Sequence, residues 1–221
     1  EISACLVGSE MCIRDRSQLG VETGGALADI LLGKANPSGK LTTTWAAFEE
    51  YPEMPDFEDM NETRYREGIY VGYRYFETLP RAQKKVIYPF GYGLTYSDTC
   101  VTEAEVVGEV SAESDIVLKA TVKNNGTVDT DEVVQVYIKD LDSLLAVRNY
   151  SLCGFKRVSL KAGEEKSVEF TISNKAMNIV DEDGNRYIAG KHFRLFAGVS
   201  QPDTRSAELT GHKPAEVEIA L

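Results

Sequence analysis

The chain has 221 residues, of which 43% are hydrophobic and 27% are charged, and its formal net charge is −11. This composition is ordinary for a globular protein with a core of its own. So acidic a surface repels a polyphosphate backbone, which argues against a nucleic-acid partner. No run approaches the roughly 18 apolar residues that span a bilayer, so no membrane partner is expected.

The sulfur and imidazole side chains give no metal or redox motif. The chain has four cysteines and two histidines: Cys5, Cys12, Cys100, Cys153, His192 and His212. Neither set has the spacing of a zinc or redox motif, and a chain of this length is no disulfide scaffold. We therefore expect reduced, unpaired thiols, no metal site and no cofactor.

The start of the chain does not behave like the rest. Residues 1–16, EISACLVGSEMCIRDR, show no helical or strand period, no cap and no turn signal. The run CLVGSEMCIRDR is similar to a translated sequencing adaptor, which predicts a non-native segment. The alternative is a strand or helix stub stranded from a larger domain. Either origin predicts few buried contacts, including at Leu6, Val7 and Ile13.

An α/β unit is predicted from residue 17 onward. Thr23 can cap a helix with one apolar stripe, and Gly33 can end it in the left-handed conformation. The stripe consists of Leu27, Ile30 and Leu31. The turn-forming residues 36–39 and the β-branched run 40–45 then predict a tight turn and a strand. Helix, turn and strand in this order are typical of an α/β layer.

Loops and aromatic segments follow. Residues 46–66 are acidic and contain Pro52 and Pro55, which predicts a long loop. Residues 67–76 carry four aromatics in seven positions. These can stack on the apolar face of a sugar or pack within a strand, and packing is the favoured interpretation. The glycine-punctuated run 88–96 predicts a segment that crosses between two domains.

Beyond about residue 100 the pattern becomes one of short alternating strands separated by turns, which predicts an antiparallel β-sandwich. The residues expected to face its core are Ile116, Leu118, Ala120 and Val122; Val134, Val136 and Ile138; Val168, Phe170 and Ile172; and Phe193, Leu195 and Ala197. The residues between them, with Gln135 and Tyr137 among them, are expected to face outward. The fold class is therefore an α/β fragment followed by an all-β, immunoglobulin-like sandwich.

Four stretches together carry a family resemblance. Residues 24–41, 65–76 and 88–96 are similar to three successive motifs at the end of the α/β sandwich domain of family 3 glycoside hydrolases. Residues 152–164 resemble the fibronectin type III-like domain that follows it in that family, the β-glucosidase and β-xylosidase type. Three motifs in the right order make the resemblance specific, whereas one alone is weak.

The resemblance implies a division of the chain. Residues 1–16 are the non-native or stranded segment, and 17–99 are the C-terminal end of the α/β sandwich domain. Residues 100–211 are the fibronectin type III-like sandwich, and 212–221 are a C-terminal tail. Within this division, residues 17–45 and 65–96 are expected to pack with each other and against the sandwich.

The resemblance also implies a retaining, exo-acting β-glycosidase whose Asp nucleophile and Glu acid/base lie in upstream domains absent from this sequence. A β-linked oligosaccharide or aryl glycoside would bind through those domains. The carboxylates that invite a catalytic assignment here are Glu22, Glu67, Asp56, Glu58, Asp59 and Glu62. Glu22 most simply complements the helix dipole, Glu67 pairs with Arg74, and the acidic run is a solvated loop. No catalytic, cofactor-binding or metal-binding residue is assigned.

Two other interpretations stay open. The sandwich can be an independent carbohydrate- or protein-binding module, or the domains can be permuted with the barrel placed after it. The expected role of residues 100–221 is structural, and the enzyme would be the parent protein. Sugar specificity, source, compartment (cytoplasmic or secreted) and oligomeric state are left open, and sequons at Asn61, Asn125 and Asn149 matter only in a secreted eukaryotic protein.

Overall fold

The computed structural model describes residues 21–52, 62, 67–78 and 86–221. The chain divides into two compact units, residues 1–36 and 37–221. No helix in the described ranges is long and apolar enough to cross a membrane. The predicted isolation of Leu6, Val7 and Ile13 lies outside the described residues.

Helix α1 (Thr23–Leu31) is the one described helix of the first unit. The predicted cap is wrong by one position: Glu22 is the N-cap residue and makes no side-chain cap bond. The reason is that the Glu22 carbonyl already accepts the first helical bond, from the Ala26 N–H at 2.9 Å. The predicted end is confirmed, since Gly33 follows with φ of 70°. No α1 residue is buried, and Leu31 is 42% exposed.

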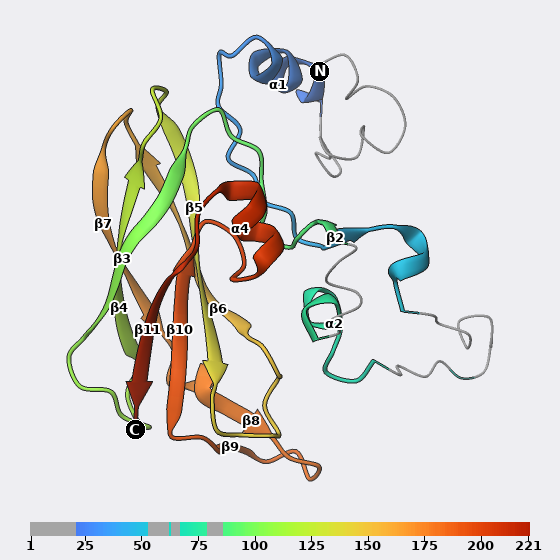
Figure 1. The fold of residues 1–221 in the computed structure, drawn as a ribbon, viewed down its shortest axis with the longest axis vertical. Coiled ribbons are helices and arrows are strands. Elements are labelled where there is room, and N and C mark those ends of the chain that lie inside the picture. Colours follow the sequence, from blue (N-terminus) through green and yellow to red (C-terminus); the bar gives the residue numbers. More distant parts are fainter. Residues whose placement is uncertain (1–20, 53–61, 63–66, 79–85) are drawn as a thin grey trace. The chain divides into compact units, whose positions relative to one another are not determined.

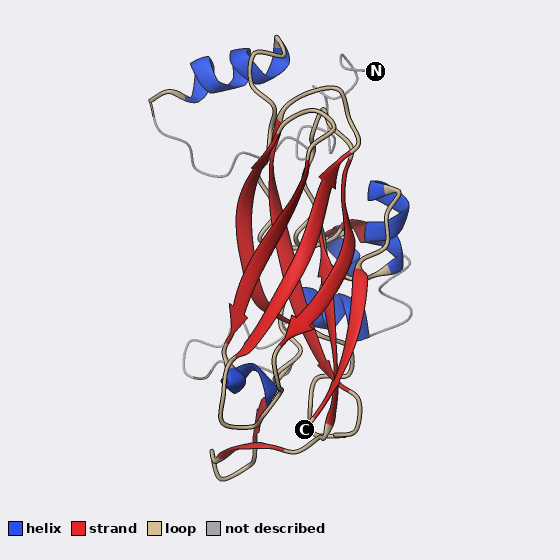
Figure 2. Cartoon of the chain, turned by 90° about the vertical axis from the view of Figure 1, so that its left-hand side faces the viewer, coloured by secondary structure: helices blue, strands red, loops and turns tan. Residues whose placement is uncertain are grey.

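The second unit is built on the predicted β-sandwich (Figures 1 and 2). Its seven strands are β3 (Thr99–Val107), β4 (Ile116–Asn124), β5 (Thr130–Asp140), β6 (Ser151–Leu160), β7 (Glu165–Ile172), β10 (His192–Gly198) and β11 (Ala215–Ala220). They form a four-stranded sheet in the order β11-β10-β5-β6 and a three-stranded sheet in the order β3-β4-β7. Every neighbouring pair is antiparallel.

The core between the two sheets confirms the predicted inward faces. Every residue predicted to face inward belongs to one buried cluster, which also contains Val101, Val158, Leu160, Met177 and Ile219. In β4 burial alternates strictly from residue to residue, because successive side chains of a strand point to opposite faces. A fully buried aliphatic or aromatic side chain contributes about 1.5–3 kcal/mol, so this cluster dominates the stability of the sandwich.

The predicted outward face of β5 is wrong. Gln135 and Tyr137 are only 2% and 0% exposed. The four-stranded sheet is covered on both sides, because Tyr73 and Phe90 pack against Tyr137 on the face opposite the core. Strand β5 therefore has polar and aromatic residues on one buried face and aliphatic residues on the other.

The predicted C-terminal tail is also corrected. Strand β11 pairs along its full length with β10, and its Ile219 is part of the core. The sequence AEVEIA alternates apolar and acidic residues, which is the period of a half-buried edge strand. Whether the domain boundary falls at residue 99 stays a prediction.

The described residues between 37 and 98, here called the segment 37–98, form short elements that lie beside the four-stranded sheet (Figure 1). The elements are β1 (Trp45–Ala46), η3 (Phe48–Glu50), α2 (Tyr73–Thr78) and β2 (Val86–Tyr88). Of the strand predicted at 40–45, only Trp45 lies in a strand, where β1 pairs with β2. Upstream of it, the Leu41 N–H donates to the Tyr92 carbonyl at 2.8 Å.

The predicted strand at 67–76 is wrong as well. Gly68 and Gly72 have φ of 59° and 63°, which favours glycine and interrupts an extended strand. Helix α2 begins directly after Gly72. The preferred packing role of the aromatics is confirmed for Tyr73, Tyr75 and Phe76, which all belong to packed aromatic or apolar clusters.

Three further elements complete the unit. They are η5 (Asn174–Met177), the hairpin of β8 (Asn178–Val180) with β9 (Arg186–Ile188), and α4 (Thr204–Thr210). Asp203 caps α4 by accepting a bond from the Ser206 N–H at 2.8 Å. Helix α4 follows β10 and contacts β2, so it lies on the same side as the segment 37–98.

Candidate functional site

The carboxylates singled out in the sequence show no catalytic arrangement in the described residues. The Glu22 side chain lies over the first turn of α1, 3.7 Å from where a Cβ on Gly25 would be. The position places a negative charge at the N-terminus of the helix, as expected for a carboxylate that complements the helix dipole. Glu62 is exposed. Asp56, Glu58 and Asp59 lie outside the described residues.

The expected ion pair of Glu67 with Arg74 is not found in the described part of the chain. Arg74 Nη2 instead donates to Ser151 Oγ on β6 at 3.0 Å. Arg74 lies on α2, and this contact holds the helix against the sheet rather than against its own preceding turn. The ion-pair prediction failed because it assumed a strand, whereas the chain turns at Gly72.

The cysteines and histidines also have local partners. Of the cysteines, Cys100 and Cys153 are described and are free thiols, and burial raises the pKa of Cys153 to about 12. His192 Nδ1 lies 3.0 Å from Asp142 Oδ2, and His212 Nε2 lies 2.5 Å from Asp98 Oδ1. No group of metal-ligating side chains occurs in the ranges that the structure describes.

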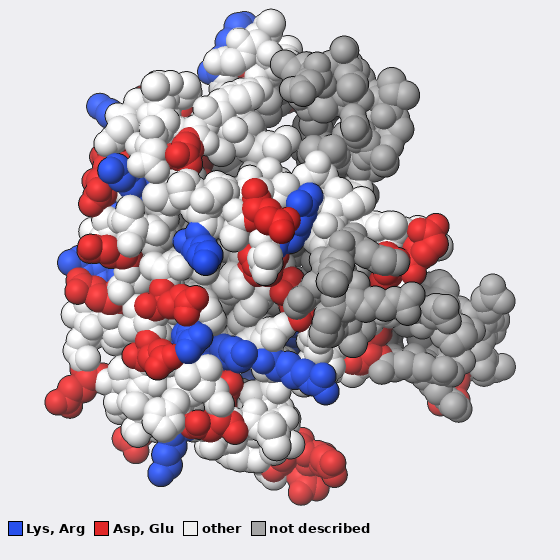
Figure 3. Space-filling view, in the orientation of Figure 1, with Lys and Arg blue, Asp and Glu red and all other residues white. Residues whose placement is uncertain are grey.

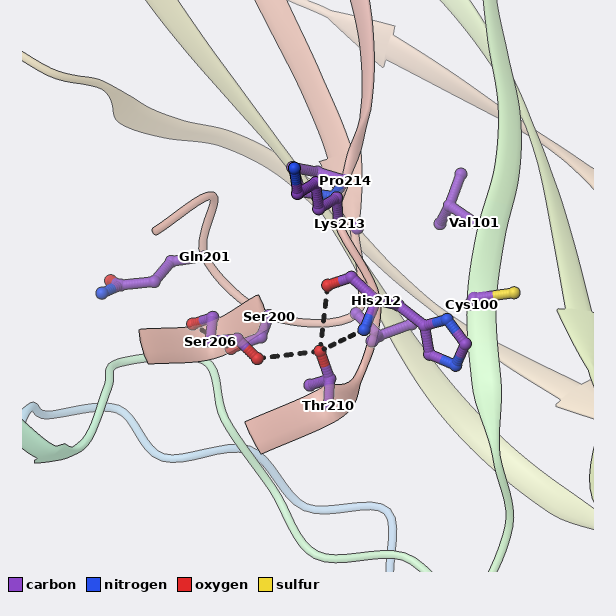
Figure 4. Close-up of a pocket in the computed structure, with 11 residues that line it drawn as sticks. Cys100, Val101, Ser200, Gln201, Ser206, Thr210, His212, Lys213 and Pro214 are labelled. Atoms are coloured by element: carbon purple, nitrogen blue, oxygen red, sulfur yellow. Dashed lines mark hydrogen bonds between the residues drawn. The ribbon is translucent and has the colours of Figure 1, made fainter. Parts of the chain in front are cut away.

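A cavity lined by several hydroxyl groups is small (Figure 4). It lies beside α4 and has a volume of about 10 Å³, which is about the space of one water molecule. Its hydroxyls are used internally: Thr210 Oγ1 donates to the Ser206 carbonyl at 2.8 Å and lies 3.1 Å from the His212 carbonyl. A sugar ring does not fit there.

Charges of both signs are mixed on the described surface. On the face in Figure 3, basic side chains are interspersed with acidic ones. An open groove between β6 and β7 is lined by Lys119, Lys156, Arg157 and Lys166. Two of its cations are already paired: Arg157 lies 2.5 Å from Asp131, and Lys119 lies 3.1 Å from Glu105.

The best-built feature is the face on which the segment 37–98 rests, here called the docking face. Its centre is an aromatic cluster of Tyr137, Tyr150 and Phe196, against which Tyr73, Phe90 and Leu152 pack. Tyr73 stacks on Phe90 with ring centroids 4.6 Å apart, and Tyr137 meets Tyr150 edge-on at 5.4 Å. Aromatic pairs of this kind add about 0.5–1.5 kcal/mol beyond the area they bury.

Gln135 joins the crossing segment to the docking face. Its Nε2 donates to the carbonyls of Gly91 at 2.8 Å and Val199 at 3.3 Å. Its Oε1 accepts from the Tyr137 hydroxyl at 2.7 Å. A Cβ on Gly91 would lie 2.1 Å from that same Oε1, and Gly91 has φ of 77°. Close backbone approach and a left-handed conformation therefore both require glycine at this position.

A buried ion pair makes a second connection. Lys40 Nζ lies 2.7 Å from Glu132 Oε1, and the two side chains are 13% and 2% exposed. Glu132 also accepts from Thr99 Oγ1 at 2.5 Å and from the Val133 N–H at 2.7 Å. This carboxylate thus has a cation and two further donors, which is what a buried charge needs to be tolerated.

Glu77 on α2 makes the third connection, and the sequence did not single it out. It is 5% exposed, and its Oε1 accepts from Gln201 Nε2 at 2.7 Å. Asn149 Nδ2 donates to its backbone carbonyl, so this sequon asparagine is used in docking α2. Burial above all, and then the charge of Asp203, raise the pKa of Glu77 to about 8. The available sequence signal was a carboxylate directly after the aromatic run Tyr73–Phe76.

Fold and docking face together define a β-sandwich that carries the end of an α/β domain. Residues 16–96 match the Glycosyl hydrolase family 3 C-terminal domain, and residues 132–201 match the Fibronectin type III-like domain. The chain thus belongs to glycosyl hydrolase family 3 and corresponds to its C-terminal part.

Relatives agree with this assignment. The chain is 38% identical over 213 residues to Beta-glucosidase A of Butyrivibrio fibrisolvens, which covers 87% of this chain and 26% of the relative. It is 34% identical over 188 residues to an exo-alpha-(1->6)-L-arabinopyranosidase of Bifidobacterium longum, and the match covers 84% of this chain and 24% of the relative. A crystal structure of a family 3 beta-glucosidase of Bifidobacterium adolescentis superimposes with a TM-score of 0.76 at 31% identity. The superposition covers 90% of this chain and 28% of that protein. The chain spans about a quarter of the length of these proteins.

Proposed function

We propose that this chain is the structural C-terminal part of a retaining, exo-acting β-glycosidase that hydrolyses O-glycosidic bonds, and that it has no catalytic activity alone. The observation that carries the proposal is the pair of family matches in the order α/β domain end, then sandwich. Retaining hydrolysis needs two carboxyl groups about 5–5.5 Å apart. Glu22 has a structural explanation, because its side chain lies over the first turn of α1. We assign the nucleophile and acid/base to preceding domains.

The role of the sandwich in this proposal is to hold the end of the α/β domain in a fixed position. Lys40, Gly91 and Glu77 of the segment 37–98 each make a buried polar contact with the sandwich. Buried polar contacts of this kind are directional, so they specify one arrangement in addition to the aromatic packing. Catalytic groups that lie on loops need a rigid scaffold to position them.

The sugar is not specified by this region. The relatives of this chain include proteins named as beta-glucosidases and as an arabinopyranosidase, at 38% and 34% identity over a similar share of the chain. Since similar C-terminal parts occur in both, we place the determinants of sugar specificity in the preceding domains.

The exposed apolar side chains of the segment are proposed to contact the rest of the α/β domain. Phe48 is 88% exposed, and Ile69, Val71 and Ile87 are also exposed. We infer that these side chains belong to one apolar patch, and such patches usually mark an interaction surface. The 221-residue chain should therefore self-associate, which sedimentation velocity at increasing concentration will show.

The matched variants separate this patch from apolar exposure in general. Phe48→Ser combined with Val71→Ser should reduce the associated fraction. Leu144→Ser, at a fully exposed position in a loop of the sandwich, should leave it unchanged. A monodisperse wild-type monomer with a single cooperative thermal transition would contradict the proposed contact surface.

Activity is the direct test of the proposed function. The purified chain should release no chromogenic phenol from aryl β-glucosides or β-xylosides at neutral pH, because each missing carboxylate supplies chemistry that binding cannot replace. Linking the upstream barrel and the earlier α/β sequence of a relative to this chain should restore hydrolysis.

Glu67→Gln is the control for a hidden active site in the chain. It should alter stability or solubility and leave turnover at the background level in the short chain. Turnover by the short chain that Glu67→Gln abolishes would overturn both the structural role and the absence of an assigned catalytic residue.

A further inference from the structure

The open groove between β6 and β7 has a charge balance opposite to that of the chain. The chain has 24 Lys and Arg residues against 35 Asp and Glu residues. The charged residues that line the groove are four cations and one acid: Lys119, Lys156, Arg157, Lys166 and Glu169. Its volume is about 630 Å³, within the range of about 300–1,000 Å³ that is usual for ligand sites. A cleft lined mainly by one sign of charge concentrates ions of the opposite sign.

The groove lies where the sandwich is open at one side. Strand β6 is an edge of the four-stranded sheet, and β7 is an edge of the three-stranded sheet. Lys156 lies opposite Val134 in its ladder, Lys166 lies opposite Val122, and both valines belong to the core. Side chains directly opposite each other in an antiparallel pair lie on the same face. Both lysines therefore leave their strands on the core-facing side and emerge in the opening between the two sheets.

These two lysines carry the uncompensated charge of the groove. The acid in the lining, Glu169, lies opposite Lys119 in the β4–β7 ladder. Lys166 Nζ lies 3.4 Å from the Ser159 carbonyl on β6, so its side chain reaches across the groove to the other wall. Neither Lys156 nor Lys166 forms an ion pair with an acidic residue in the described part of the chain. The groove thus offers one free cation from each wall.

An acidic glycan fits this groove better than a denser polyanion or a peptide. Double-stranded DNA carries one negative charge per about 1.7 Å of its axis, and the net charge of −11 on the chain repels such a density. A uronate chain carries a single carboxylate on each sugar ring, so its charges are farther apart. Core-facing lysines on an edge strand oppose pairing with a further strand, which disfavours an extended peptide.

The base of the groove suits a sugar ring as well. Val158 and Val168 line the groove, and both belong to the core, at 7% and 6% exposure. The C–H face of a sugar is apolar, so it can cover these valines while the carboxylates meet the lysines.

We propose that this groove binds an acidic glycan, a chain of uronate residues, whose carboxylates are held by Lys156 and Lys166. The site goes beyond the proposed glycosidase function and does not depend on it, because every group in it belongs to this chain.

Fluorescence anisotropy of an oligogalacturonate labelled at its reducing end, titrated with the whole chain, tests the proposal. The wild type should bind it saturably, and the fully methyl-esterified oligomer, which has the same sugars without the charges, should not bind. Lys156→Gln combined with Lys166→Gln should weaken binding about tenfold, because two charge-assisted contacts are lost. The control, Lys175→Gln combined with Lys191→Gln, removes the same charge at exposed positions outside the groove. At about 0.1 M salt, where distant charges are screened, it should change binding by no more than about twofold.

A charge-preserving variant separates loss of charge from loss of structure. Lys156→Arg combined with Lys166→Arg keeps both cations and should bind like the wild type. No saturable binding by the wild type, or equal binding by the two glutamine pairs, would overturn the site. An oligoglutamate or a single-stranded oligonucleotide of the same charge that binds as tightly through the same lysines would overturn the assignment to a glycan.

Discussion

Replacing Phe193 with alanine is expected to lower the free energy of unfolding by about 3–5 kcal/mol. Phe193 is 1% exposed and lies on β10 in the core between the two sheets. Its neighbours in the ladder are Asp140 on β5 and Ile219 on β11, so it lies in the middle of the four-stranded sheet. Alanine removes the transfer free energy of the ring and leaves a cavity that β5 and β11 hold open.

Phe155→Ala is the matched control for this variant. Phe155 lies on the edge strand β6 and is 71% exposed, so the same substitution should change stability by less than about 0.5 kcal/mol. Urea unfolding followed by circular dichroism measures both effects. If the two variants lose similar amounts, burial in this core is not what stabilises the sandwich.

The sandwich was predictable because its signal is local. From Ile116 to Val122 in β4 every second residue is apolar, and the register of a strand follows from its own sequence when one face is buried. Strand β11 carries the same kind of signal in Val217 and Ile219, which alternate with acidic residues. The sequence was therefore sufficient to predict a strand there instead of a tail.

The docking face was not predictable in the same way. Gln135 and Tyr137 have the period of an exposed face, but residues far away in the sequence, Tyr73 and Phe90, cover them. Periodicity shows which residues share a face, and it does not show what a distant segment places on that face. For the same reason Glu77 could not be recognised: its partners Gln201 and Asp203 lie more than a hundred positions later.

The error at residues 67–76 has a different origin. Aromatic residues favour strands on average, but this preference is weak and depends on packing. The glycines at 68 and 72, both left-handed, were the stronger local signal, because they mark turns on either side of Ile69–Val71. The aromatic side chains then pack from a short helix instead of a strand.

Replacing Lys40 with methionine should be among the most damaging changes outside the core. It removes the cation that lies 2.7 Å from Glu132, whose side chain is 2% exposed. Removing one partner of a buried ion pair costs about 3–5 kcal/mol, because the remaining charge is left uncompensated. The loss should appear in urea unfolding monitored by Trp45, which lies in the same segment as Lys40.

Two further variants show whether the uncompensated charge is the cause. Adding Glu132→Gln to Lys40→Met should recover most of the loss, because glutamine removes the charge. Its amide oxygen can still accept from the Val133 N–H, and its amide nitrogen can donate to Thr99 Oγ1, whose hydroxyl can turn to accept. Lys119→Met removes a cation from the exposed pair with Glu105, 3.1 Å away, and should cost no more than about 1 kcal/mol.

The comparison also tests how the segment 37–98 and the sandwich are joined. If Lys40→Met costs no more than Lys119→Met, the contact with Glu132 behaves as a solvated surface pair, and the segment is held by its aromatic packing and by its contacts with Gln135 and Gln201. If Lys40→Met lowers the free energy of unfolding as much as expected and Glu132→Gln restores it, the buried ion pair joins the segment to the sandwich. The segment 37–98 and the sandwich then unfold in one cooperative transition, because losing Lys40 from the segment leaves the Glu132 charge in the sandwich without a partner.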